Sequence, residues 1–261
     1  MKKWMTALAV LACAHGSWAE ETAVAGEPAP AAVVAGQPDA YPFQISLLTP
    51  IQLVAPEENV SGLRLNLLYG ENKNVTGLDL GLVNSVTGDR HGAMIGIGNV
   101  VEGNQRGLQL GLVNYAGGET EGSQIGALNL ENMDLTGWQY GLVNVAQGQV
   151  RGGQGGYVNY AGEHVTGTQA GLLNWAYAAT HQFGIVNLTK AEVNTQLGLF
   201  SYAANVDGLQ LGALNVGREV KGFQFGLINW AQQLDGLQIG LVNYAANSRV
   251  LPVLPIVNWA F

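Results

Sequence analysis

The sequence is poor in charged residues and almost free of cysteine. Asp, Glu, Lys and Arg together make up 11% of its 261 residues, well below the usual share of about a quarter. Cys13 is the only cysteine, so the chain has no partner for an internal disulfide. The net charge is −8 and Lys and Arg form no cluster. We therefore expect no nucleic acid partner, because phosphate backbones are bound by concentrated positive charge.

The sequence also lacks the motifs of common catalytic and metal sites. His91, His164 and His181 share no ligand spacing with another His, Asp or Glu. No G-x-S-x-G motif occurs, and the Gly-rich stretch 151–159 lacks the G-K-[ST] ending of a phosphate-binding loop. We expect no catalytic residue, no cofactor-binding residue and no metal site, and hence no enzyme.

The first nineteen residues have the pattern of an export signal. Lys2 and Lys3 precede a short apolar run, and Ser17-Trp18-Ala19 places small residues before a cleavage site after Ala19. In an alternative interpretation "VLAC" is a lipobox and Cys13 becomes a lipid-modified N-terminus. No apolar run is long enough to cross a bilayer as a helix. Residues 20–40, rich in Ala, Pro and Gly, are expected to be a flexible leader.

Glycine, in contrast, is abundant at 37 residues, and it recurs at regular intervals. From Gly77 to Gly236, twelve units of 13–15 residues carry the motif G-x-Q-x-G-x-x-N. The second Gly is present in all twelve units, the Asn in eleven with Ser201 as the exception, and the Gln in ten with Asp79 and Met94 as replacements. The chain thus divides into an N-terminal capping segment (41–76), the repeats (77–250) and a closing segment (251–261).

The pattern inside each unit predicts an all-β protein. In "GLQLGLVN", Leu108, Leu110 and Leu112 face one way, and Gln109, Gly111 and Val113 face the other. Two Gly in eight residues disfavour a helix. A parallel β-solenoid of about 12–14 coils, one coil per unit, would stack identical amides about 4.8 Å apart, where they can hydrogen-bond along the axis. The residues expected to form this structural ladder are Gln109, Gln139, Asn114, Asn144, Gly111 and Gly141.

An antiparallel outer-membrane β-barrel of about 14 strands is the alternative fold. The chain ends in "VNWAF", which resembles the C-terminal strand of such proteins, with Phe261 last. Two features favour the solenoid. The Leu face offers only about three apolar residues per unit, whereas a membrane-spanning strand needs about 9–11 residues, and Pro252 and Pro255 fit poorly inside a closing strand.

Aromatic residues repeatedly follow the motif Asn, or Ser201 in its place, by one position. In a solenoid they would line up along the stack, either as packing that covers it or as a stripe that binds a glycan or another partner. In the barrel they would form a girdle at the membrane interface. The residues of this candidate binding stripe are Tyr115, Tyr160, Trp175, Tyr202, Trp230, Tyr244 and Trp259.

The G-[LFW]-Q-x-G-L-[VIL]-N units resemble those of bacterial surface-repeat proteins grouped as a Leptospira-type surface-repeat family. The resemblance covers about residues 62–261. It implies export and a place at the cell surface, in the outer membrane or in the periplasm of a Gram-negative-type bacterium, and it supplies no catalytic residue. We expect a non-catalytic structural or adhesive scaffold whose partners are envelope components, glycans or surface proteins. The alternatives are an outer-membrane pore or envelope channel, and a glycan- or partner-binding module that uses the aromatic stripe.

Overall fold

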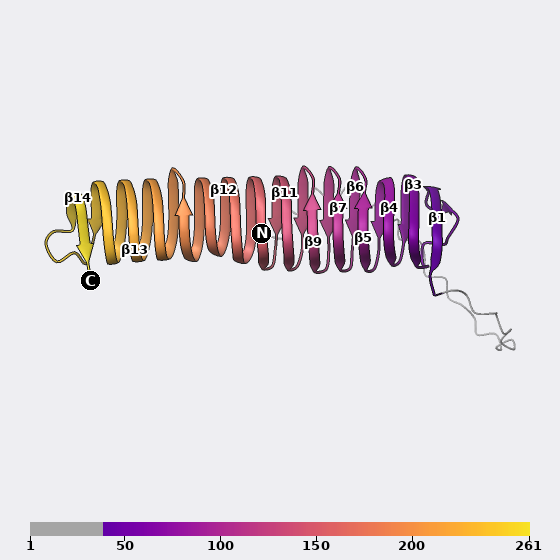
Figure 1. Cartoon of the computed structure of the whole chain (residues 1–261), viewed down its shortest axis with the longest axis horizontal. Helices are drawn as coiled ribbons and strands as arrows, with labels where there is room; N and C mark the ends of the chain where they lie inside the picture. Colours follow the sequence, from indigo (N-terminus) through magenta and orange to yellow (C-terminus); the bar gives the residue numbers. More distant parts are fainter. Residues whose placement is uncertain (1–38) are drawn as a thin grey trace, which may run out of the picture. The chain divides into compact units, whose positions relative to one another are not determined.

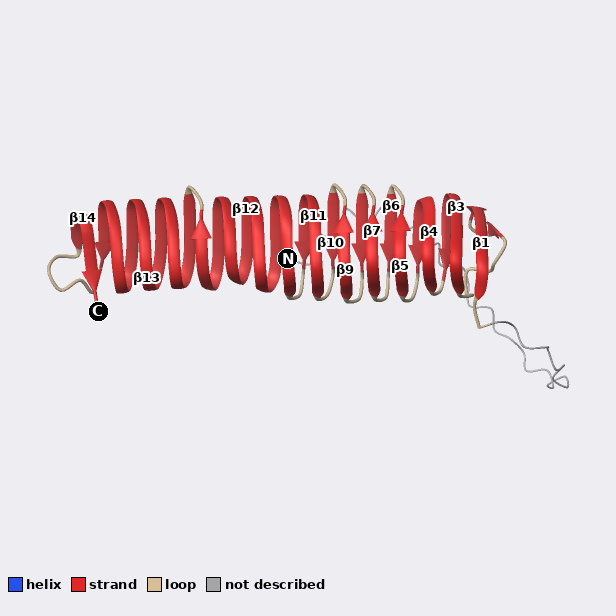
Figure 2. Cartoon of the chain, viewed as in Figure 1, coloured by secondary structure: helices blue, strands red, loops and turns tan. Residues whose placement is uncertain are grey.

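The computed structural model describes residues 39–261, which wind into a stack of parallel β-coils with no helix among them (Figures 1 and 2). The stack makes about 11 turns, close to the number expected from the repeat count. The predicted all-β solenoid is therefore confirmed. The export signal, the lipid-modified Cys13 alternative and nearly all of the leader lie outside the described residues.

The strands differ in length because some corners interrupt the regular pairing and others do not. The first coils contain β1 (Tyr41–Leu48), β2 (Ile51–Gln52), β3 (Val60–Asn72) and β4 (Val75–Val86). Short strands follow in the next coils: β5 (Arg90–Ile95), β6 (Gly98–Val101), β7 (Gln105–Leu110), β8 (Val113–Ala116), β9 (Thr120–Ile125) and β10 (Leu128–Glu131). The next strand, β11 (Leu135–Ala146), continues through one bend, and β12 (Val150–Leu197) and β13 (Phe200–Ala245) continue through several. The last strand is β14 (Val253–Ala260).

Neighbouring coils pair in parallel, with each repeat position beside the same position of the next coil. Between β11 and β12, Gly137 pairs with Gly152 and Gln139 pairs with Gln154. Equivalent registers join β4, β5, β7 and β9 on one side of the coils and β4, β6, β8 and β10 on the other. The antiparallel barrel alternative is therefore wrong for these residues, and the pore or channel role that depended on it is withdrawn.

Each coil is flat, with two strands that face each other across a thin interior. In the unit that opens at Gly137, β11 bends at Gly141 and so contributes to both sides of the coil. Its first half, up to Tyr140, pairs with β9, and its second half, up to Ala146, pairs with β10. Side chains alternate in and out along each strand, but the alternation breaks at the bend. Leu112 and Val113 are consequently both exposed, whereas the sequence pattern had placed them on opposite faces.

The repeated glycines are required because neighbouring backbones come very close at two places in each coil. Gly137 has φ +140°, and a Cβ there would lie 1.8 Å from the carbonyl oxygen of Gly122 in the preceding coil. At Gly141 a Cβ would lie 2.2 Å from the carbonyl oxygen of Gly126 and 2.7 Å from Nδ2 of Asn129. Any side chain at either position would push adjacent coils apart.

The two ends of the stack depart from the regular coil. At the N-terminal end β1 pairs in parallel with β3, and the short β2 folds back antiparallel to β1. At the C-terminal end β14 runs antiparallel to β13. These strands occupy the outer edges of the first and last coils, where a regular coil would leave backbone groups open for pairing with another chain.

Candidate functional site: an amide interior and an apolar exterior

The motif glutamines form a continuous hydrogen-bonded ladder inside the stack. Gln139 donates from Nε2 to Oε1 of Gln124 at 2.7 Å, and the same step repeats from Gln124 at one end to Gln238 at the other, at 2.6–2.8 Å. A second contact orients most of these amides, as when Gln139 Nε2 donates to the carbonyl oxygen of Val145 across the coil at 3.3 Å. Gln109 and Gln139 are fully buried.

The motif asparagines form a second ladder that runs in the opposite direction. Asn144 donates from Nδ2 to Oδ1 of Asn159 in the following coil at 2.9 Å, whereas each glutamine donates to the preceding coil. Asn144 Nδ2 also donates to the carbonyl oxygen of Gly155 at 2.9 Å, which orients the amide. Asn114 makes the equivalent contacts to Asn129 and to the carbonyl of Ile125. Gly111 and Gly141 leave the space that these amides fill.

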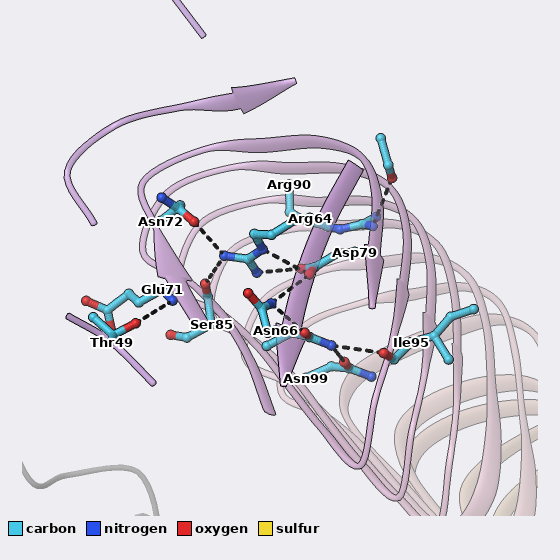
Figure 3. A network of polar contacts seen from close by, with 12 residues as sticks. Thr49, Arg64, Asn66, Glu71, Asn72, Asp79, Ser85, Arg90, Ile95 and Asn99 are labelled. Atoms are coloured by element: carbon cyan, nitrogen blue, oxygen red, sulfur yellow. Dashed lines mark hydrogen bonds and ion pairs between the residues drawn. The ribbon is translucent and has the colours of Figure 1, made fainter. Parts of the chain in front are cut away.

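A buried ion pair replaces the glutamine ladder in the first coils (Figure 3). Arg64 and Asp79 occupy the glutamine position of their coils and are paired there, with Nε of Arg64 2.9 Å from Oδ1 of Asp79. Nη1 of Arg64 also donates to the carbonyl oxygen of Ser85 at 2.9 Å. Asn66 donates to Asp79 and to Asn84, and so connects the ion pair to the start of the asparagine ladder. A buried pair satisfied in this way is a structural element.

Four buried polar side chains separate the two apolar clusters of the interior. One cluster extends from Leu135 to Ala260, and the other lies in the first coils. The four side chains are those of Arg90, Gln105, Thr120 and Glu131, and all four are buried. Each of them has at least one buried nitrogen or oxygen atom without a hydrogen-bond partner. Such atoms cost stability because nothing replaces the water that they lose.

Burial shifts the pKa values of the two charged members of this group. Burial raises the pKa of the Glu131 carboxyl to about 8, although the hydrogen bond that it accepts from the backbone N–H of Met133 acts in the opposite direction. Burial lowers the pKa of the Arg90 guanidinium to about 10, while the nearby Asp79 charge raises it and Arg64 lowers it. Glu131 is therefore largely protonated at neutral pH, and Arg90 keeps its charge.

Six residues of the candidate aromatic stripe lie in one row along the stack, but aliphatic residues interrupt the row. Tyr160 and Trp175 stack in adjacent coils with ring centroids 4.6 Å apart, and Trp230 and Tyr244 stack at 5.7 Å. Leu130, Val145, Leu188 and Val216 stand between the aromatic residues of this row. Tyr115 is half-buried, and burial, with the nearby charges of Glu102 and Glu131, raises the pKa of its phenol.

Trp259 lies outside the row. Because β14 runs antiparallel to β13, Trp259 pairs with Leu237 on the other side of the coil, and not with Tyr244. Spacing alone could not reveal this reversal, since the sequence "VNWA" keeps the motif of the preceding units.

The exterior of the coils is apolar, a feature that the sequence interpretation missed. If the opening residue of each unit is position one, side chains at positions two, four, six, seven and nine point outward. In the Gly137 unit these are Trp138, Tyr140, Leu142, Val143 and Val145. Across the twelve units none of these positions is Asp, Glu, Lys or Arg. We call the surface made by these positions the apolar surface, and positions six and seven, where the chain bends, the Leu corner.

The Leu corner is the most exposed part of the apolar surface. Leu112, Leu142, Leu227 and Leu241, all at position six, are 59%, 51%, 56% and 68% exposed. Half or more of the surface of each of these residues is thus open to solvent in the isolated chain. A single exposed leucine is ordinary, but a row of them along the stack indicates a surface that something covers.

Charged residues of the repeats gather on the opposite edge, at positions eleven to fifteen, which we call the turn edge. Exposed pairs join adjacent coils there: Arg106 Nε lies 3.2 Å from Oε2 of Glu121, and Arg151 Nη1 lies 3.6 Å from Oδ2 of Asp134. Asp134 also accepts a hydrogen bond from the backbone N–H of Gln149 at 2.9 Å. The coils are therefore amphipathic across their width.

The most evident hollow on the turn edge has a simple structural cause. The unit that contains Tyr177 is two residues shorter than the preceding unit and one residue shorter than the following unit, so its turn is recessed between two longer turns. The hollow is lined by residues that include Glu163, His164, Tyr177 and Glu192. In residues 39–261 no three His, Cys, Asp or Glu side chains are grouped as metal ligands, and His91, His164 and His181 stand in different coils.

Comparisons with protein-family models, with curated proteins and with solved structures give no match to this chain. The resemblance to the Leptospira-type surface-repeat family therefore stays a prediction from the motif. Among the described residues no helix is long and apolar enough to cross a membrane.

Proposed function

We propose that this chain is a non-catalytic, exported repeat protein of the cell envelope that acts by binding through its repeated surface. The observation that carries the proposal is the uniformity of the exterior, where the apolar surface repeats in every unit from Gly77 to Gly236. Catalysis needs dissimilar groups that converge at one place. The recurrent polar groups here are amides, and they are already paired inside the stack.

Repetition favours binding because many weak, equivalent contacts add up to useful avidity. The parallel stack displays its contacts at a constant spacing of about 4.8 Å. Export is supported by the pattern of the first nineteen residues, and a place in the envelope by the resemblance of the repeat motif. The intact mass of the chain recovered from cells tests export. Loss of the first nineteen residues supports it, and retention of Met1 contradicts it.

A glycan or surface protein as the partner is favoured by one specific observation, the stacked pairs Tyr160–Trp175 and Trp230–Tyr244. Each stacked pair forms a rigid, partly exposed aromatic block, and Tyr and Trp are enriched at binding interfaces because they combine an apolar ring with a polar group.

A screen against glycans and extracellular-matrix proteins tests this choice. It compares the wild type with a Tyr115→Ala, Trp175→Ala, Trp230→Ala variant and with a matched Trp138→Ala, Tyr140→Ala, Tyr157→Ala control, whose rings lie outside the row. Loss of a ligand in the first variant alone supports the stripe. Equal binding by all three proteins would show that the row only packs.

A further inference from the structure

We propose that the apolar surface is a lipid-binding surface: the stack lies along one leaflet of a bilayer, with the Leu corner among the acyl chains and the turn edge in water. The inference rests on the proposed binding function and names its partner. Its starting point is the absence of Asp, Glu, Lys and Arg from five outward positions in twelve consecutive units, together with their concentration on one edge.

The shape of the apolar surface favours a bilayer over a second copy of the chain. A copy packed on one face would cover on the order of 800 Å², about what each partner gives to a stable interface. It would leave the Leu corner and the face of the other strand row in water. Leu142, at the corner, and Tyr140, on the face before it, are both exposed. Lipid acyl chains, in contrast, can cover both strand faces and the Leu corner at the same time.

The order of side chains around the coil matches the order of layers in a leaflet. Leu142 and Val143 stand at the tip, Val145 or an aromatic residue follows at position nine, and the charged turn comes next. The aromatic residues of the row, such as Trp175 and Trp230, therefore lie between aliphatic and charged residues, which is where Trp and Tyr concentrate at membrane interfaces. The distance from the tip to the turn edge is about 15 Å from the rise per residue of a strand, close to the thickness of one leaflet.

The interior of the stack tolerates such an environment because its backbone groups and most of its motif amides are paired. Backbone groups bond between coils, and the motif amides bond along the two ladders. Lipid excludes unpaired N–H and C=O groups, so a stack with paired internal groups can enter a leaflet where an open sheet cannot. No transmembrane segment is needed, because the stack enters only one side of the membrane.

Charge plays little part in this recognition. The chain has a net charge of −8, so anionic lipid gives no attraction. We expect the full-length protein to bind vesicles of pure phosphatidylcholine at least as well as vesicles in which part of it is replaced by phosphatidylglycerol, with little dependence on salt. A preference for anionic vesicles that disappears in salt would contradict the proposal, since it would indicate a basic patch as the site.

Co-sedimentation with phosphatidylcholine vesicles tests the location of the surface. Leu227 and Leu241 are exposed Leu-corner residues of adjacent coils, and the exposed Gln232 and Gln233 lie on the turn between them. L227E/L241E should weaken the partition into vesicles roughly tenfold or more, because each carboxylate would have to enter the acyl region. The matched Q232E/Q233E variant should bind like the wild type. Equal binding by L227E/L241E, with unchanged melting temperature, overturns the proposal.

Site-specific labels test the depth of insertion independently of affinity. Cys13 is the only cysteine, so in a Cys13→Ala background a fluorophore can be attached singly at Leu142→Cys, Val145→Cys or Gln147→Cys of one coil. Lipids with brominated acyl chains should quench the label at 142 most, at 145 less and at 147 least. Equal quenching, or a label at 142 that is shielded without vesicles because copies associate, overturns the proposal.

These outcomes separate the two proposals. If the wild type ignores vesicles but binds a glycan or protein that the stripe variant loses, the lipid inference falls and the proposed function stands. If the wild type binds neither vesicles nor any partner in the screen, both fall.

Discussion

Ser201 and Asn187 occupy the same position in adjacent coils, yet no hydrogen bond joins their side chains. Before this pair Asn174 donates to Asn187, and after it Asn215 donates to Asn229, so the ladder is continuous on both sides. The serine is too short to continue the chain of amides. Its hydroxyl and Oδ1 of Asn215, in the following coil, are both buried without a partner. The asparagine ladder thus has a gap inside an otherwise regular stack.

Ser201→Asn should close this gap and stabilise the protein. The new amide would accept from Asn187 and donate to Asn215, which adds two hydrogen bonds and removes both buried unpaired atoms, the Ser201 hydroxyl and Oδ1 of Asn215. We expect a gain of about 1 kcal/mol, measured as a higher free energy of unfolding in urea. Ser123→Asn, on the outside of its coil, is the matched control and should have little effect. An unchanged or lower stability of Ser201→Asn would mean that the gap is not a defect.

Asn144→Ala and Gln139→Ala test the ladders where they are continuous. Without the amide of Asn144, Oδ1 of Asn159 loses its donor inside the stack. Each substitution should cost about 1–3 kcal/mol, and the two together should cost more than either alone. Leu142→Ala, an exposed change in the same coil, should cost less. Chemical unfolding of the wild type and the four variants provides the comparison, and wild-type stability in the double variant would refute a structural role for the amides.

Gly137→Ala should be strongly destabilising, because its φ of +140° and the carbonyl oxygen 1.8 Å from the added Cβ both oppose a side chain. Gly98→Ala is a sharp control. A Cβ there would meet the Val83 side chain at 3.7 Å, an ordinary contact. We expect Gly98→Ala to be neutral or slightly stabilising and Gly137→Ala to lower the melting temperature by several degrees. Similar melting temperatures for the two variants would contradict the close backbone approach.

Glu131→Ala should change how stability depends on pH. Burial raises the pKa of this carboxyl from 4.5 to about 8 in the folded chain. The folded state therefore binds more protons than the unfolded state between these two values, and stability falls as pH rises through this window. Alanine occupies the same position in both adjacent coils, at Ala116 and Ala146.

The substitution should therefore stabilise the protein at pH 8 by about 1–3 kcal/mol, and by less at pH 5. Glu121→Ala, an exposed carboxylate, is the control and should leave the pH dependence of unfolding as it is in the wild type. If the wild-type and Glu131→Ala stabilities ran parallel from pH 5 to 8, the raised pKa would be wrong.

Repetition made the solenoid predictable, since a constant interval that holds Gln and Asn fixed while Leu varies is the pattern of stacked, in-register coils. The side of the coil on which each residue lies was harder to predict from the sequence. The bend at Gly111 turns both Leu112 and Val113 outward, and a period of two along the chain gives no sign of it. Leucine is usually buried and glutamine and asparagine are usually exposed, whereas this protein buries the amides and exposes the leucines. The usual burial preferences of these residue types therefore predicted the opposite arrangement.

The rest of the site depends on contacts between units that differ from the motif. Arg64 and Asp79 replace glutamine in adjacent coils, and only their register shows that they form one ion pair. The position of Trp259 depends on the reversed direction of β14, which begins after Pro252 and contains Ile256, a residue with φ of 70°. Such end effects are set by tertiary pairing, and the repeat pattern carries no information about them.

Because the two amide ladders run in opposite directions, their dipoles along the stack largely cancel. Aligned amides add their dipoles, as peptide groups do in a helix, and leave partial charges at the two ends. Here the amide of Gln139 points its N–H toward the first coil and that of Asn144 points toward the last. The two columns oppose each other coil by coil, so lengthening the stack adds little field at either end. A membrane potential would therefore exert little torque on it through these amides.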